Sequence, residues 1–372
     1  MINKNILFLY HTDQPYILFH YESLKKEYKH VVKFNYADTL RDYGLKAMEL
    51  KINEIVHDKD VDITFVFLYE HKLELHPDFL NELRKNTAIV FWLFDDEILL
   101  HSHTKYQAQT ADAVITTDYF GRYYYEQIGI PSILYFGSYP VKDYYPSSTH
   151  KNIDISFVGL VETGDRASYL EYLEEAGLSV ETFGGGTKNG FLTFDEMINV
   201  FSRSKISLNF TKPYNFDWID KNDPLIARNK QNKGRPIELA MCKTFCLCED
   251  APPVHKLFKV GEEIDTFNSK EELLEKIKIY LDDDSLRENI ANKAYDRALN
   301  EYQTDKYIAN VTNELESILN TSKTLHKPID TIYLSDLYKR RLKSFFIKKA
   351  YDAFKNKHFK LMFKHISSIF RK

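Results

Sequence analysis

The chain has 372 residues and a mass of 43.9 kDa, a length that predicts two domains of ordinary size. Hydrophobic residues make up 44% of it and charged residues 28%, and this balance excludes global disorder. The net charge is −4, and no apolar run approaches the ~18 residues of a membrane span.

Strands and helices alternate along the first part of the chain. Apolar runs predict strands at 5–10, 31–35, 63–68, 88–94, 113–117 and 132–136, and helical spacing predicts helices at 16–28, 45–57, 77–85, 105–111 and 119–127. Such alternation is typical of a doubly wound parallel sheet. Residues 1–140 are therefore predicted to form a Rossmann-like domain.

The same alternation returns after a segment at 137–151 that is rich in Pro and Tyr and serves as the predicted linker. Strands are expected at 153–158, 179–183, 206–210 and 245–248, and helices at 167–176, 193–202, 236–242, 271–281 and 286–302. Residues 152–305 thus predict a second Rossmann-like domain. A helix at 306–319, within a segment 306–326, is expected to return to the first domain.

The last segment, 327–372, differs in composition from the rest. It holds 13 Lys or Arg and 3 Asp or Glu, and apolar residues recur in it at helical spacing. A basic amphipathic helix of this kind is typical of a segment that lies on an anionic membrane surface. Packing against the body with a solvated basic face is the main alternative, and a nucleic-acid partner is not expected.

Three cysteines, Cys242, Cys246 and Cys248, lie close together in the sequence. An odd number of cysteines, with no signal-peptide pattern at the amino terminus, predicts a cytoplasmic location. A zinc site is not expected, because a second ligand pair is missing.

The stretch from Lys233 to Asp250 holds a helix start, a short helix, a buried strand and a turn. Pro236 suits the first helical position, and Glu238 falls in the first turn, where the helix dipole favours a carboxylate. The strand at 244–248 ends in the turn at 249–253. In open parallel sheets, ligands bind at this carboxyl edge.

The pattern Arg235-Pro-x-Glu238-x-Ala, followed by this strand and by Leu257-Phe-x-x-Gly-Glu-Glu, resembles the carboxyl-terminal half of GT-B glycosyltransferases. The similarity is greatest to the spore-maturation (CgeB-like) group, akin to the group 1 glycosyl transferases. Supporting patterns occur in order across roughly residues 60–310: Ile155-Ser-Phe-Val-Gly159, Phe183-Gly-Gly-Gly186, Ser204-Lys-Ile-Ser-Leu-Asn209, Ser269-Lys-Glu-Glu-Leu and Leu281-Asp-Asp-Asp-x-x-Arg287.

The resemblance implies a GT-B fold, with two Rossmann-like domains facing across a cleft and a nucleotide-sugar donor bound by the second. Loss of a nucleotide diphosphate leaves negative charge that cations or N–H groups must stabilise. Arg166, Lys233 and Arg235 are the predicted cations, and bidentate binding favours the arginines. Surface salt bridges are the alternative reading for all of them.

Four further donor contacts are expected from the resemblance, at Gly159, Gly185, Asn209 and Glu238. Glu238 would accept hydrogen bonds from the ribose hydroxyls, or would be only a helix-dipole carboxylate. The glycine run around Gly185 by itself equally predicts a turn. It lacks the spacing of dehydrogenase and kinase phosphate loops.

One position departs from the family pattern. Retaining members carry a Glu-x7-Glu pair, and Lys230 stands where the first glutamate belongs, with Glu238 as the second. The stereochemical outcome is therefore left open.

The candidate acceptor bases follow predicted strands of the first domain. Asp95 and Asp96 come after the strand at 88–94, His71 follows the neighbouring strand, and His11 follows the first. Each has a purely structural alternative. The Asp-x-Asp patterns that a metal-dependent GT-A enzyme would use read as turns, so no metal or other cofactor is expected.

Together these features predict a glycosyltransferase that uses a UDP-, GDP- or dTDP-sugar and acts on a cell-envelope glycan, a lipid-linked intermediate or a protein. It is expected to be cytoplasmic, with peripheral association at the inner face of the cell membrane through 327–372. Two alternatives stay open: a sugar-nucleotide epimerase or hydrolase on the same fold, and a non-catalytic scaffold.

Overall fold

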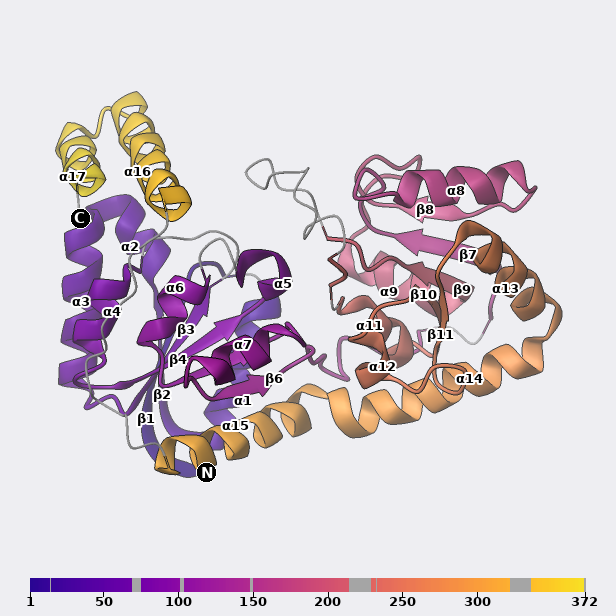
Figure 1. Cartoon of the computed structure of the whole chain (residues 1–372), viewed down its shortest axis with the longest axis horizontal. Helices are drawn as coiled ribbons and strands as arrows, with labels where there is room; N and C mark the ends of the chain where they lie inside the picture. The colour runs from indigo at the N-terminus through magenta and orange to yellow at the C-terminus, as the bar shows by residue number, and fades with distance from the viewer. Residues whose placement is uncertain are drawn as a thin grey trace. The chain divides into compact units, whose positions relative to one another are not determined.

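The computed structural model describes residues 1–13, 15–68, 75–100, 104–147, 150–213, 229–231, 233–321 and 336–370. The chain divides into two compact units (Figure 1): the first contains residues 1–135 and 308–372, and the second contains residues 136–307. Each unit is built on its own parallel sheet.

The sheet of the first unit has six strands in the order β2-β1-β3-β4-β5-β6, all parallel. The strands are β1 (Ile2–Tyr10), β2 (Tyr28–Asn35), β3 (Ile63–Leu68), β4 (Ala88–Leu93), β5 (Ala113–Thr116) and β6 (Ser132–Leu134). The helices are α1 (Pro15–Glu27), α2 (Tyr36–Tyr43), α3 (Leu45–Asp58), α4 (Pro77–Leu83), α5 (Asp96–Leu99), α6 (Lys105–Gln107) and α7 (Gly121–Gln127).

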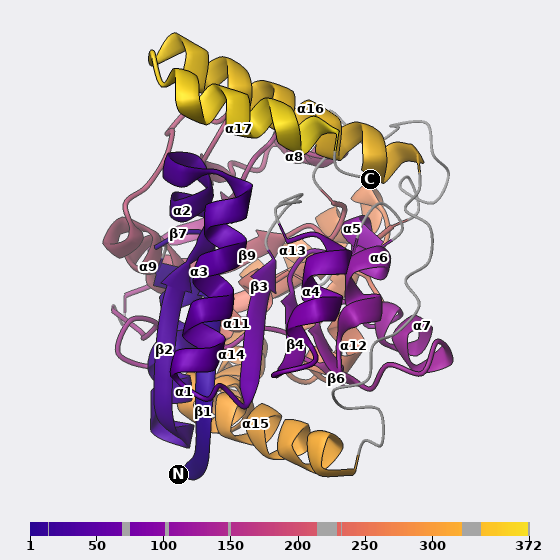
Figure 2. The ribbon, with the colours of Figure 1, turned by 90° about the vertical axis from the view of Figure 1, so that its left-hand side faces the viewer.

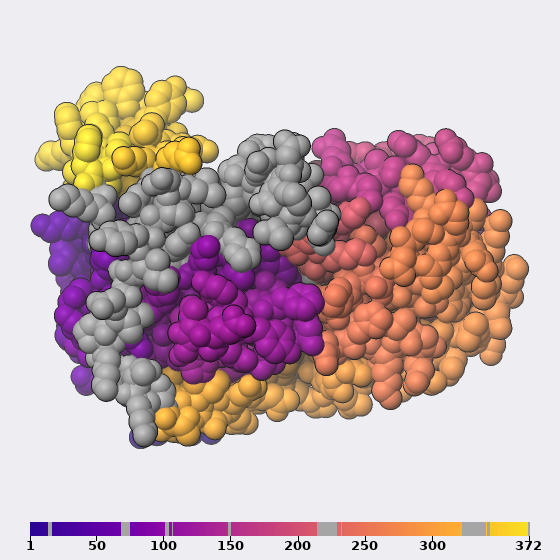
Figure 3. Space-filling model, viewed as in Figure 1, coloured from indigo at the N-terminus to yellow at the C-terminus, as the bar shows by residue number. Residues whose placement is uncertain are grey.

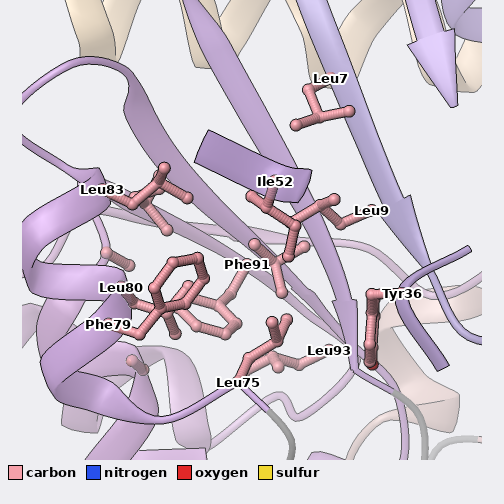
Figure 4. Close-up of a cluster of buried hydrophobic side chains, with 14 of the residues drawn as sticks. Leu7, Leu9, Tyr36, Ile52, Leu75, Phe79, Leu80, Leu83, Phe91 and Leu93 are labelled. Atoms are coloured by element: carbon pink, nitrogen blue, oxygen red, sulfur yellow. The ribbon is translucent and has the colours of Figure 1, made fainter. Parts of the chain in front are cut away.

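Both faces of this sheet are covered, which is why its central strands read as continuous apolar runs. On one face, side chains of β1 and β4 pack against α3 and α4, and Figure 4 shows this cluster. The labelled members include Leu9, Phe91, Ile52 and Phe79. On the other face, His20 of α1 lies 4.8 Å from the ring of Trp92 on β4.

The sheet of the second unit has five parallel strands in the order β11-β10-β9-β7-β8. The strands are β7 (Ile153–Val158), β8 (Glu181–Phe183), β9 (Ser204–Asn209), β10 (Phe245–Glu249) and β11 (Asp265–Phe267). The helices are α8 (Arg166–Glu175), α9 (Phe194–Arg203), α11 (Arg235–Met241), α12 (Val254–Leu257), α13 (Lys270–Asp282) and α14 (Asp284–Arg297), which continues into a π-helical turn (Ala298–Tyr302).

A long helix, α15 (Thr304–Thr321), leads out of the second unit, and its residues from Ile308 onward belong to the first. There Glu316 accepts hydrogen bonds from Lys4 Nζ (2.6 Å) and from the Tyr28 hydroxyl (3.0 Å). Carboxylate and lysine are both partly buried, and this contact ties the end of α15 to the amino-terminal strand.

The predicted fold class, two Rossmann-like parallel sheets with a helical carboxyl-terminal segment, is confirmed. The strands predicted at 63–68 and 153–158 match β3 and β7 to the residue. The sequence missed α2, α5, α12 and β11. Apart from α2, these elements have only three or four residues, which is too short for helical or strand periodicity to be recognised in the sequence.

The tail prediction needs one correction, because the single helix is two. Helices α16 (Asp336–Lys355) and α17 (Phe359–Ile369) are separated by a turn in which Lys357 has a φ of +59°. In Figure 2 they run side by side above α2 and α3. Residues other than glycine seldom adopt left-handed backbone angles, so the sequence does not predict that the chain turns at Lys357.

A buried ion pair offers a test of the first unit's packing. Arg84 donates to Asp112 Oδ1 from Nε (2.9 Å) and from a terminal nitrogen (2.6 Å), and both side chains are almost fully buried. Asp112→Ala should lower the free energy of unfolding by about 3–5 kcal/mol, because the buried guanidinium loses its carboxylate. Urea denaturation measures this.

The matched control for this test lies on the same helix end. Lys85 and Glu82 form an exposed pair (2.6 Å), so Glu82→Ala should change the free energy of unfolding by about 1 kcal/mol or less. Equal effects of the two substitutions would contradict the assignment of the buried pair.

Candidate functional site

The carboxyl edge of the second sheet gathers the loops that follow β7, β9 and β10. Arg166, the first residue of α8, reaches back over this edge. Its guanidinium donates to the Leu160 carbonyl after β7 (3.0 Å) and to the Lys212 carbonyl after β9 (3.3 Å). The side chain thus spans the ends of two adjacent strands.

The positive charge of Arg166 is buried without a carboxylate partner among the described residues. The residue is 9% exposed, both of its hydrogen bonds go to carbonyl groups, and its Nε has no partner in the described part of the chain. Burial lowers the pKa of Arg166 to about 10; Glu249 opposes this shift and Arg235 adds to it. A buried cation in this state is an anion-binding candidate.

Glu249, the last residue of β10, organises the neighbouring loop. It is 3% exposed and accepts hydrogen bonds from the Thr211 N–H (2.9 Å), the Thr211 hydroxyl (3.1 Å) and the Lys212 N–H (3.3 Å). Lys230 Nζ lies 3.5 Å from the other Glu249 oxygen and donates to the Asp250 carbonyl. Glu249 therefore fixes the loop whose Lys212 carbonyl holds Arg166.

Arg235 and Glu238 pair with each other at the start of α11, one turn apart. The Arg235 guanidinium also lies 4.8 Å from the centroid of the Phe201 ring, and one of its nitrogens is 3.4 Å from the sulfur of Met197. The two charged side chains keep 23% and 15% of their surface exposed, so both remain accessible.

A side chain at Gly234, just before α11, would displace the neighbouring Tyr139 side chain. A Cβ at this position would lie 1.7 Å from the Tyr139 hydroxyl, so only a bare backbone lets that tyrosine approach the helix start. Gly184 is constrained in the same way after β8. Its φ is +116°, and a Cβ there would lie 2.3 Å from the Gly159 carbonyl oxygen.

The glycine run therefore packs against the loop after β7, and Val161 N–H donates to the Gly185 carbonyl (3.1 Å). Asn209 at the end of β9 is buried, and its amide donates to the Cys248 sulfur (3.0 Å). Lys233 donates to the Gln231 side chain. These contacts give Gly185 and Asn209 a structural role at the same edge.

The structure thus brings Gly159 and Arg166 together and pairs Arg235 with Glu238. Sequence reasoning missed Glu249 and Lys212. Lys212 forms an ion pair with Asp165, directly before Arg166. Their only sequence signal is their position at the ends of two predicted strands.

The candidate bases of the first unit lie at the carboxyl edge of its sheet. Asp95 follows β4 with a left-handed φ of +52°, and His11 follows β1. Asp96 is fully buried and accepts hydrogen bonds from the hydroxyls of Thr116 (3.0 Å) and Tyr125 (2.7 Å). That burial favours a structural role for Asp96. His71 lies outside the described residues.

No curated protein sequence matches this chain. Residues 166–313 match the family model described as glycosyl transferase-like. Among solved structures, Anabaena HepE in complex with UDP and glucose has a TM-score of 0.61 at 13% identity, over 85% of this chain and all of that one. Sucrose-phosphate synthase from Thermosynechococcus elongatus has a TM-score of 0.61 at 10% identity, over 86% and 100%. A glycosyltransferase from Rickettsia africae has a TM-score of 0.59 at 11% identity, over 86% and 100%.

Residues 166–313 are thus similar to a glycosyl transferase-like family, and the whole chain shares the fold of these solved structures. The predicted fold, GT-B, is thereby confirmed, and the match to the glycosyl transferase-like model begins at Arg166 itself. The match does not extend to the spore-maturation group, so membership of that group stays a prediction.

Three further observations concern the described part of the chain. Within the described residues, no cluster of three or more His, Cys, Asp or Glu side chains has the arrangement of a metal site. No helix in the same part of the chain is both long and apolar enough to cross a membrane. Cys242, Cys246 and Cys248 are buried free thiols.

Asp96 gives the first unit a pH-dependent stability. Burial raises the pKa of Asp96 from 3.8 to about 7, Asp118 adds to this, and the Thr104, Tyr125 and Thr116 hydroxyls oppose it. Because the pKa of Asp96 is higher in the folded state than in the unfolded state, protonation of Asp96 stabilises the folded unit. This contribution to the free energy of unfolding is complete below pH 3.8 and is lost as the pH rises to 7. The loss should be about 1.4 kcal/mol per pH unit at most.

The comparison of wild type with Asp96→Asn isolates this contribution, because asparagine does not ionise. Urea unfolding at pH 5 should show the variant less stable than wild type, and by pH 7.5 the difference should shrink. A difference that stays constant between the two pH values would show that Asp96 is ionised throughout.

Proposed function

We propose that this protein transfers a sugar from a UDP-sugar and binds the donor diphosphate at the carboxyl edge of its second sheet. The observation that carries the proposal is the buried Arg166 guanidinium, which has no carboxylate partner among the described residues. An anionic group that binds there would compensate a charge that is otherwise desolvated. A sugar-nucleotide diphosphate supplies such a group in glycosyl transfer.

The choice of uridine as the base is supported by similar structures. Anabaena HepE is known in complexes with UDP and with UDP-glucose, and the pneumococcal O-GlcNAc transferase GtfA in a complex with UDP and GlcNAc. These proteins share the fold with this chain at 11–13% identity. UDP-sugars are therefore the first donors to test, ahead of GDP- and dTDP-sugars.

The chemistry follows from the charges at the edge. Cleavage of the bond between the sugar and the diphosphate develops negative charge on the leaving group, and fixed cations lower the barrier if they are already in place. Arg166 is held in place by two carbonyl groups, and Arg235 is held by Glu238 and by the Phe201 ring. In this proposal, Arg166 and Arg235 stabilise the negative charge on the leaving diphosphate, which a metal ion stabilises in other transferases.

Glu238 is assigned to the sugar side of the donor. Its carboxylate is partly exposed and already oriented by Arg235, so it is suited to accept hydrogen bonds from two ribose hydroxyls. Lys230, which stands where retaining relatives have a glutamate, contacts Glu249 and adds a further cation to the diphosphate side. This replacement makes phosphate binding, and not nucleophilic chemistry, the proposed role of position 230.

The acceptor in this proposal is a cell-envelope glycan, a lipid-linked intermediate or a protein. Its hydroxyl needs a base, and His11 and Asp95 are the described candidates that keep surface exposure at the carboxyl edge of the first sheet.

The role of Arg166 can be tested by binding alone. Arg166→Met should weaken UDP binding by about 10- to 100-fold, because charge-assisted contacts to the diphosphate are worth about 1.5–3 kcal/mol. Binding of uridine, which has no phosphate, should stay unchanged. Isothermal titration calorimetry measures both affinities on the same preparation.

The control is Arg203→Met, which removes an exposed guanidinium that contacts Asn152 and Asn199 in the same unit. Its UDP affinity should equal that of wild type. If Arg166→Met weakens uridine and UDP binding equally, the residue acts through the fold of the edge and the diphosphate assignment fails.

Turnover tests the Arg235–Glu238 pair. Arg235→Ala and Glu238→Ala should each abolish donor-dependent activity on a panel of UDP-, GDP- and dTDP-sugars, with far-UV circular dichroism unchanged. Glu181→Ala, an exposed substitution on β8, is the matched control and should keep full activity. Chelation of metals with EDTA should leave the wild-type rate unchanged.

The products of the same panel separate the alternatives. Release of nucleotide diphosphate only when an acceptor is present supports transfer. Interconversion of sugar nucleotides would instead indicate an epimerase, release without acceptor a hydrolase, and binding without turnover a scaffold.

A further inference from the structure

One face of the paired helices α16 and α17 packs against the rest of the first unit. Phe346 of α16 is 1% exposed and belongs to the core cluster that contains residues of β1, α3 and β4. Its ring lies 6.3 Å from that of His365 on α17, which is also buried. Lys364 Nζ donates to the Tyr43 carbonyl at the end of α2 (3.0 Å). The pair is therefore anchored through these residues.

A second apolar face of α16 is left uncovered. Ile347, Tyr351 and Phe354 are 56%, 64% and 55% exposed. Their spacing of four and three residues places them on one stripe of the helix. Phe346 cannot share that stripe, because adjacent residues on a helix point about 100° apart.

Helix α17 repeats the arrangement. Phe359, Phe363 and Phe370 are 53%, 64% and 79% exposed, and Ile366, at helical spacing between them, is half-buried. Phe354 and Phe359 are in ring contact at 6.2 Å, so the two stripes meet at the turn between the helices. Figure 3 shows the outer surface of the pair uncovered by other described elements on the side in view.

The polar residues around these stripes carry one sign of charge. Residues 340–370 contain nine Lys or Arg and a single acidic residue, Asp352. Lys343, Lys348, Lys355 and Lys360 are exposed. Aromatic and aliphatic side chains set among lysines are the composition of a segment that lies in the interface of an anionic bilayer.

We propose that the exposed stripes of α16 and α17 dock this protein on the surface of an anionic lipid bilayer. The aromatic side chains enter the boundary between headgroups and acyl chains, and the lysines contact lipid phosphates. A second copy of the chain is a poorer occupant, because it would bring nine cations against nine. This inference does not depend on the donor site.

The test is vesicle flotation with the full-length protein. Wild type should float with vesicles of mixed phosphatidylcholine and phosphatidylglycerol but not with phosphatidylcholine alone, and added salt should weaken binding. The variant Tyr351→Ser/Phe354→Ser/Phe363→Ser should reduce binding by at least about tenfold. The variant Lys348→Gln/Lys355→Gln/Lys360→Gln should do the same.

The control variant is Phe120→Ser/Phe191→Ser, which removes two exposed aromatic residues elsewhere on the chain and should bind as wild type does. Thermal unfolding and UDP affinity of all variants should equal those of wild type, because every substituted side chain is exposed. Wild type that fails to float, or a control that loses binding equally, would overturn the proposal. So would a dimer in light scattering that only the aromatic variant abolishes.

Discussion

The constraint on which the second unit depends is the desolvated charge of Arg166. A parallel sheet brings the ends of β7 and β9 to one edge, and the carbonyl groups that leave those ends hold the guanidinium. A side chain at Gly159 would force the Phe157 ring to shift, because a Cβ there would lie 2.9 Å from that ring. Glu249 fixes the second of the two carbonyls through the Lys212 loop. Backbone geometry thus holds a cation at the edge where open parallel sheets generally bind ligands.

Much of this fold could be predicted from the sequence, because both sheets are parallel and buried on both faces. Strands such as β3 and β4 are then almost entirely apolar runs between helices. The misses have a physical reason. β11 has three residues, and it is a strand only because Leu247 and Glu249 of β10 lie beside it in register. Local sequence does not contain that pairing.

The candidate site divides in the same way. Arg235 and Glu238 lie one helical turn apart, so their proximity follows from local spacing. The contact of Glu249 with Thr211 joins two strand ends 38 residues apart and requires the strand order to be known. Asp96 shows the opposite case. Its position after β4 suggests an exposed catalytic carboxylate, but hydroxyls from two later elements enclose it. Burial of a polar side chain is decided by partners that the local sequence does not reveal.

In the carboxyl-terminal helices, packing against the first unit and an exposed apolar surface occur together. The run Phe345-Phe346-Ile347 places apolar side chains on more than one side of α16, so periodicity alone cannot assign a single face. The structure gives Phe346 to the core and leaves Ile347 outside. Packing against the first unit therefore accounts for one face of the helix pair. A second face carries exposed aromatic side chains and is surrounded by lysines. An apolar surface of this extent on a segment with nine cations and one anion is stable in water only at a cost, which an anionic, amphipathic surface would remove.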